Sequence, residues 1–127
     1  WAARQAPFAQ VLHPALPASP GHAHWQAVCG AADAAGQGAA ASLFSVVIDE
    51  KFSREQVDAF CDALRLFRIG YSWGGPFSLV MPYELQTMRH DWPAHLARGT
   101  LVRFAIGLED TADLQGDLQH AMQQTLA

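Results

Sequence analysis

Four runs of apolar residues along the chain have the length and composition of β-strands. Phe8 to Leu12 predicts a first strand, and the β-branched and aromatic run from Leu43 to Ile48 predicts a buried central one. Two further strands are predicted from Phe77 to Met81 and from Thr100 to Ile106.

Side chains alternate between the two faces of the last predicted strand, and this alternation decides on which face Arg103 lies. Val102, Phe104 and Ile106 share one face, whereas Arg103 lies on the other, because successive side chains of a strand point to opposite faces. Arg103 therefore points away from the apolar stripe of its own strand.

The clearest helix signal lies in the middle of the chain. Ser53 precedes Gln56 by three residues, the spacing of a capping box, and Phe52 and Val57 stand where a hydrophobic staple would pack. A helix is therefore predicted to begin at Ser53. Its apolar stripe consists of Val57, Phe60, Cys61 and Leu64.

Two more helices and one loop complete the predicted elements. A short helix is expected near His22 to Val28, followed by a loop over the small residues 30–42. A last amphipathic helix is expected after the cap candidates Asp110 and Thr111. Its apolar positions are Leu114, Leu118, Met122 and Leu126.

This order of elements predicts the α+β class, with a mostly antiparallel sheet of about four strands and helices packed on one face. A chain of 127 residues, half of them hydrophobic, can bury one core without a disulfide or a metal. Cys29 and Cys61 are accordingly expected to be buried free thiols.

Charge and hydropathy exclude several classes of partner. The net charge of −4 comes from 12 acidic and 8 basic residues without a basic patch, which argues against nucleic-acid binding. No apolar run is long enough to span a membrane, and the chain is expected to be cytoplasmic. His13, His22 and His24 lie in a proline-rich connection, so surface histidines are favoured over a metal site.

The stretch Gly70-Tyr71-Ser72-Trp73-Gly74 satisfies the G-x-S-x-G pattern of a hydrolase nucleophile elbow. That elbow requires a helix directly after the serine, but here Gly75 and Pro76 follow and then a predicted strand. Candidate triad partners, Asp91 or Asp110 with His95 or His120, occur in the right order, which a chain rich in Asp and His meets easily by chance. A loop that holds a substrate is the favoured interpretation.

Two longer stretches carry a family resemblance, "LFRIGYSWGGPFSLVMP" and "GTLVRFAIGLEDTADLQGDLQHAM". With "FAQVLHPALPASPGHAHW" and "LFSVVI", nearly the whole chain resembles the C-terminal domain of the Cys/Met-metabolism family of pyridoxal-phosphate enzymes. The similarity is greatest to the branch of β-lyases that cleave cystathionine. Trp73 before the double glycine favours that branch over the γ-lyases and γ-synthases, which remain an alternative.

The resemblance implies a role in substrate binding for four residues. Arg103 would bind the α-carboxylate of an amino-acid substrate, for which a planar guanidinium is suited. Ser72, Trp73 and Tyr71 would lie on the loop beside it, with the Trp73 indole as an added donor. The family often has a glutamate shortly after the glycines, where this chain has Pro76-Phe77-Ser78.

The resemblance also implies groups that this chain lacks. The family binds pyridoxal phosphate through a Schiff-base lysine in a large N-terminal domain, whereas the one lysine here, Lys51, lies in a turn-like segment. We therefore expect residues 1–127 to be a single small C-terminal domain with no catalytic, cofactor-binding or metal-binding residue, inactive by itself. Its expected partners are its own N-terminal domain and the neighbouring subunits of a homotetramer. The alternative is a stand-alone module that binds an amino acid or mediates dimerisation.

Overall fold

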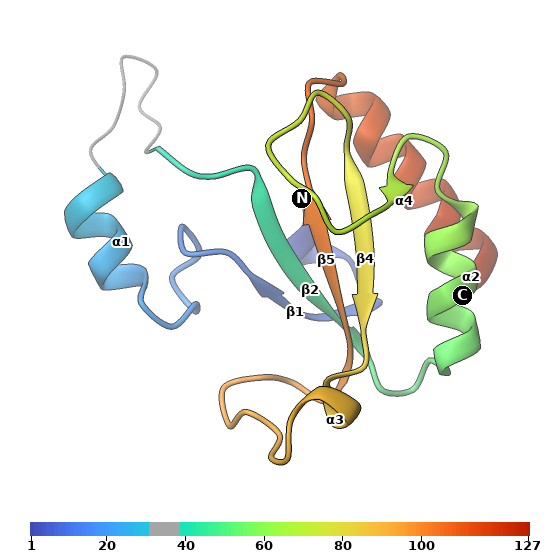
Figure 1. Ribbon diagram of the computed structural model, residues 1–127, viewed down its shortest axis with the longest axis horizontal. Helices are drawn as coiled ribbons and strands as arrows, with labels where there is room; N and C mark the ends of the chain where they lie inside the picture. The colour runs from blue at the N-terminus through green and yellow to red at the C-terminus, as the bar shows by residue number, and fades with distance from the viewer. Residues whose placement is uncertain (31–38) are drawn as a thin grey trace.

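The computed structural model describes residues 1–30 and 39–127, which form a five-stranded sheet with helices around it (Figure 1). The strands are β1 (Phe8–Leu12), β2 (Leu43–Asp49), β3 (Arg68–Ile69), β4 (Leu79–Tyr83) and β5 (Gly99–Ala105). The helices are the 3₁₀ helix η1 (Ala2–Arg4), α1 (His22–Cys29), α2 (Arg54–Ala63), α3 (Leu85–Met88) and α4 (Thr111–Thr125).

The sheet order is β1-β2-β5-β4-β3, which makes β5 the central strand. It pairs antiparallel with β2 on one side and β4 on the other, and only the short β3 runs parallel to its neighbour β4. Arg103 lies opposite Ser45 of β2 and Met81 of β4. A residue in the middle of β5 is thus held by hydrogen-bonded strands on both sides.

One face of the sheet is covered by α2 and α4, which lie side by side in Figure 1, whereas α1 stands apart on the other side of that view. Buried side chains of both helices pack against Val46, Ile48, Val80, Val102 and Phe104 of the strands. The apolar stripes predicted for the two helices are all buried. The predicted α+β class with helices on one face is confirmed.

Local sequence signals explain where the two long helices begin. The Ser53 side chain accepts from the backbone N–H of Gln56, and the Gln56 side chain accepts from the N–H of Ser53, so the predicted capping box is present. The carboxylate of Asp110 caps α4 by accepting from the N–H groups of Ala112 and Asp113.

The structure also departs from the sequence-based predictions. The sheet has five strands instead of about four, because β3 was not predicted. Strand β4 begins at Leu79, two residues after the predicted start at Phe77. Cys61 is buried as expected, and burial, followed by the nearby Asp58 and Asp62 carboxylates, raises the pKa of its thiol to about 12. Cys29 is only half-buried, so the prediction of two buried thiols is wrong for it.

Some predictions lie partly outside the described residues. The predicted loop over 30–42 includes residues 31–38, of which the structure gives no description. Within the described ranges, no helix has the length and apolar character needed to cross a membrane.

Candidate functional site

Arg103 extends from the central strand on the face opposite to the core helices. Its neighbours on β5, Val102 and Phe104, are fully buried in the core, so alternation turns Arg103 to the other side. Its Nη2 donates to the carbonyl oxygen of Tyr71 at 2.6 Å and lies 3.4 Å from that of Gly70. The guanidinium is therefore attached to the beginning of the loop between β3 and β4.

Two tyrosines stand beside this guanidinium. The Arg103 Cζ lies 5.8 Å from the ring centroid of Tyr83, and the Tyr83 ring meets that of Tyr71 in a T-shaped pair with centroids 6.4 Å apart. Tyr71 is 67% exposed, whereas Tyr83 is half-buried at the end of β4. The structure thus brings Tyr71 together with Arg103 and adds Tyr83, which the sequence did not indicate.

The charge of Arg103 has no acidic partner in the described part of the chain. The ion pairs found there join Arg54 to Asp58 and to Glu84. Within the same residues, the Nε of Arg103 is buried and has no hydrogen-bond acceptor. A buried donor without an acceptor is costly, so the described residues leave the Arg103 guanidinium incompletely hydrogen-bonded.

Ser72 and Trp73 are exposed on the loop that Arg103 holds, with Trp73 at 63% exposure. Across residues 1–30 and 39–127, no hydrogen bond reaches the Ser72 hydroxyl or the Trp73 indole. Gly74 follows with a φ of 73°, a conformation that favours glycine, and the chain continues into β4 without a helix. The turn from strand to helix that a nucleophile elbow requires is not present at Ser72.

The far end of this loop is fastened by a cluster that the sequence analysis did not predict. The carboxylate of Glu109 accepts from the backbone N–H of Ser78 at 2.7 Å and from its hydroxyl at 2.8 Å. The fully buried Ser78 hydroxyl in turn accepts from the N–H of Gly107 at 2.9 Å, and the N–H of Leu108 donates to the carbonyl of Pro76. The residues just after β5 therefore hold the end of the loop.

The hydrogen bonds of this cluster govern the ionisation of Glu109. Partial burial by itself raises the pKa of the Glu109 carboxyl, but hydrogen bonds from the Ser78 backbone, the Glu109 backbone and the Ser78 hydroxyl outweigh it and lower that pKa below its ordinary value. A side-chain Cβ at Gly107 would lie 2.4 Å from the Pro76 carbonyl and 2.5 Å from the Glu109 carboxylate. The close approach requires glycine at this position.

Comparison with known proteins identifies the family. The family model described as "Cys/Met metabolism PLP-dependent enzyme" matches residues 1–123. The chain belongs to this family of pyridoxal-phosphate enzymes. It is 39% identical to cystathionine β-lyase of Salmonella typhimurium over 120 residues, which are 93% of this chain and 28% of that enzyme.

Other proteins that resemble this chain have different names. It is 33% identical to the L-alanine/L-glutamate racemase of Wolbachia pipientis over 96% of this chain and 28% of the racemase. The structure of CalE6, a methionine γ-lyase from Micromonospora echinospora, superposes with a TM-score of 0.68 and 28% identity, covering 95% of this chain and 28% of CalE6. The chain therefore spans less than a third of the length of these relatives.

The family's cofactor forms a Schiff base with a lysine, and the one lysine of this chain is Lys51. Lys51 is exposed in the turn between β2 and α2, and its Nζ lies 4.9 Å from the ring centroid of Phe52. The backbone N–H of Lys51 donates to the Asp49 carboxylate.

His22 and His24, which the sequence analysis placed in a proline-rich connection, lie in helix α1. His22 lies at the beginning of α1, with its Nδ1 2.8 Å from the Pro14 carbonyl and its ring stacked on Trp25. Among the residues that the structure describes, no three His, Cys, Asp or Glu side chains are placed to hold a metal ion.

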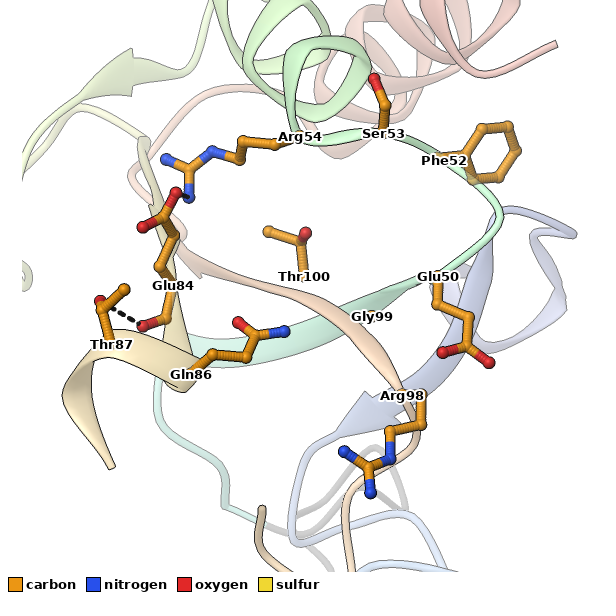
Figure 2. Close-up of a pocket in the computed structure, with 10 residues that line it drawn as sticks. All are labelled: Glu50, Phe52, Ser53, Arg54, Glu84, Gln86, Thr87, Arg98, Gly99 and Thr100. Carbon is orange, nitrogen blue, oxygen red and sulfur yellow. Dashed lines mark hydrogen bonds and ion pairs between the residues drawn. The ribbon is translucent and has the colours of Figure 1, made fainter. Parts of the chain in front are cut away.

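A pocket of about 520 Å³ lies away from Arg103, between the beginnings of α2, α3 and β5 (Figure 2). Arg54 and Glu84 face each other across it in an ion pair of 2.9 Å, and Thr87 donates to the Glu84 carbonyl. None of the four predicted substrate-binding residues lines this pocket. Of its two arginines, Arg54 has carboxylate partners, whereas Arg98 has none among the described residues and its Cζ lies 5.2 Å from the ring centroid of Trp92.

Proposed function

We propose that this chain is the C-terminal substrate-recognition domain of a pyridoxal-phosphate-dependent cystathionine β-lyase. The family match and the 39% identity to the Salmonella typhimurium enzyme support this reaction. The whole enzyme would convert cystathionine to homocysteine, pyruvate and ammonia, with the electron sink supplied by the cofactor in an N-terminal domain. We place the enzyme in the cytoplasm as a homotetramer.

The role that we assign to this chain is to bind the substrate carboxylate through Arg103. The observation that carries the proposal is a guanidinium on the central strand that is held at Nη2 by the carbonyl of the Tyr71 loop and has no acidic partner among the described residues. A planar guanidinium can bind a carboxylate with two charge-assisted hydrogen bonds. Because Nη2 is held by the Tyr71 carbonyl, the group is oriented before the substrate arrives.

The exposed loop residues would complete the binding site. Tyr71, Ser72 and Trp73 follow directly after the backbone that Arg103 holds, and their side chains are exposed. The Ser72 hydroxyl and the Trp73 indole N–H can each donate a hydrogen bond to a carboxylate. The function of this domain is therefore to fix the orientation of the substrate's Cα relative to the chemistry performed elsewhere in the enzyme.

The first prediction tests Arg103 in the full-length enzyme. Arg103→Ala should lower kcat/KM for cystathionine by about 10- to 150-fold for each charge-assisted hydrogen bond lost, since such bonds contribute about 1.5–3 kcal/mol. Arg103→Lys should retain part of the activity, because a lysine keeps the charge without the planar fork. The measurement is steady-state kinetics of pyruvate release.

Arg89→Ala is the matched control, because it removes an exposed arginine that is not part of this site. The visible absorbance of the bound cofactor should be the same in all variants, which separates loss of substrate binding from loss of cofactor. A kcat/KM of Arg103→Ala equal to that of Arg89→Ala would exclude the carboxylate-binding role.

The similarity to a methionine γ-lyase structure supports a second candidate reaction, a γ-elimination. The products distinguish the two reactions: β-elimination of cystathionine releases pyruvate and homocysteine, whereas γ-elimination releases 2-oxobutyrate and cysteine. We expect pyruvate as the main keto acid when the products are separated by chromatography. Predominant 2-oxobutyrate would favour the γ-lyase.

A further inference from the structure

Tyr83 occupies a position on β4 from which its ring can reach Arg103. Met81 is the direct partner of Arg103 in the antiparallel ladder, and Tyr83 is two residues further along, opposite Leu101. Residues two apart on a strand share a face, and diagonal neighbours on paired strands lie within reach of aromatic side chains. The register therefore places Tyr83 on the same face of the sheet as Arg103.

Two aromatic contacts connect Tyr83 to the proposed site. The Arg103 Cζ lies 5.8 Å from the Tyr83 ring centroid, within the range of a cation–π interaction. The Tyr71 ring meets the Tyr83 ring at an interplanar angle of 62°. Tyr83 thus contacts both the guanidinium and the residue whose carbonyl accepts the Nη2 hydrogen bond.

We propose that Tyr83 is a positioning residue, whose ring fixes the orientation of the Arg103 guanidinium for binding the substrate carboxylate. This inference rests on the proposed function of Arg103. Arginine has a flexible stem, and the hydrogen bond from Nη2 fixes only one corner of its planar group. The Tyr83 ring adds a second point of contact, so the donors that remain face a fixed direction.

The ring, and not the hydroxyl, is the part of Tyr83 that makes this contact. In the full-length enzyme, Tyr83→Leu should therefore raise the KM for cystathionine about two- to fivefold, the effect of a partly exposed cation–π contact, with a smaller change in kcat. Tyr83→Phe keeps the ring and should have the KM of the parent enzyme. If Tyr83→Leu does not fold, Tyr83→Met serves as the variant without a ring.

Phe77→Leu is the matched control. Phe77 is an exposed aromatic residue whose ring centroid lies 5.1 Å from the Cζ of another arginine, Arg68. Removing its ring deletes an arginine–aromatic contact of the same kind that does not involve Arg103. The KM of Phe77→Leu should equal that of the parent enzyme.

A double-mutant cycle separates positioning from a general structural role. If Tyr83 acts through Arg103, Tyr83→Leu should leave the KM unchanged in the Arg103→Ala background. An equal rise in KM in both backgrounds, no rise in the parent background, or a Tyr83→Phe variant that behaves like Tyr83→Leu would overturn the inference. A normal KM in Arg103→Ala alone would instead reject the proposed function of Arg103.

Discussion

At the scale of single residues, Glu109 and Arg103 attach opposite ends of the same loop. Its carboxylate binds both the backbone and the hydroxyl of Ser78, at the end of the loop whose beginning Arg103 holds. Arg103 lies on β5, and Glu109 lies four residues after its end. Both ends of the loop are therefore attached to β5 or its continuation.

Glu109→Gln should lower the free energy of unfolding at pH 7 by about 1 kcal/mol, because hydrogen bonds to a charged acceptor are stronger than those to a neutral one. The pKa of Glu109 is lowered in the folded protein, so its stabilisation is fully present above the unfolded-state value near 4.5 and is lost as the pH falls through the folded-state value. Urea unfolding of both proteins between pH 7 and pH 3 measures this. A stability difference that did not shrink on acidification would contradict the assignment.

The sequence indicated Arg103 but not Glu109 or Tyr83, for a physical reason. Alternation along one strand is a local property, and it sufficed to place Arg103 opposite the apolar stripe. The contact of Tyr83 with Arg103 depends on the register between two strands, and the contact of Glu109 with Ser78 joins residues 31 positions apart. The sequence analysis noted that Pro76-Phe77-Ser78 stand where the family often has a glutamate, but this gave no indication that Ser78 binds Glu109.

At the scale of elements, the start of β5 depends on Gly99. Its φ is 139°, and a Cβ there would lie 1.8 Å from the carbonyl oxygen of Ile48 on the paired strand β2. A side chain at this position would force the two central strands apart. Gly116, on the exposed side of α4, provides the opposite case, because a Cβ added there would meet no neighbouring atom within 4 Å.

Gly99→Ala should therefore destabilise the protein by more than about 1 kcal/mol, since backbone strain and a collision with the main chain add together. Gly116→Ala should stabilise it by about 0.5–1 kcal/mol, because alanine is favoured over glycine within a helix. Thermal unfolding of the two variants beside the parent chain measures both effects. Equal melting temperatures for the two variants would contradict this account of β5.

The elements that were predicted share strong local signals, and those that were not lack them. The capping box at Ser53 and the four-residue spacing in α4 specify their helices locally. Strand β3 has two exposed residues and α3 has four residues, too few for a periodic pattern. The shift of β4 arises because Ser78, just before the strand, is bound by a distant carboxylate.

Pro82 shows a further reason why the end of β4 was not predicted. Proline is unfavourable inside a central strand because it has no N–H to donate. Within the described sheet, β4 pairs with β3 only at Leu79 and Val80, so the edge beside Pro82 has no neighbouring strand. Tertiary context, and not local propensity, makes proline acceptable there.

At the scale of the whole molecule, recognition and chemistry are proposed to be separate. The purified chain of 127 residues should therefore release no pyruvate from cystathionine when pyridoxal phosphate is added, because Lys51, its one lysine, lies in an exposed turn. A lactate dehydrogenase assay measures pyruvate, with the full-length enzyme as the positive control. Turnover by the chain alone, abolished by Lys51→Ala, would contradict this separation.

The attachment of the loop after β3 has a consequence for how such proteins diversify. Its anchors are the carbonyls of Gly70, Tyr71 and Pro76 together with Ser78, so the exposed side chains between them do not hold the loop in place. If Ser72 and Trp73 bind the substrate as proposed, substitutions there would change the ligand without disturbing these anchors. Such an arrangement would allow specificity to change at little cost in stability, and the relatives of this chain include a β-lyase and a racemase.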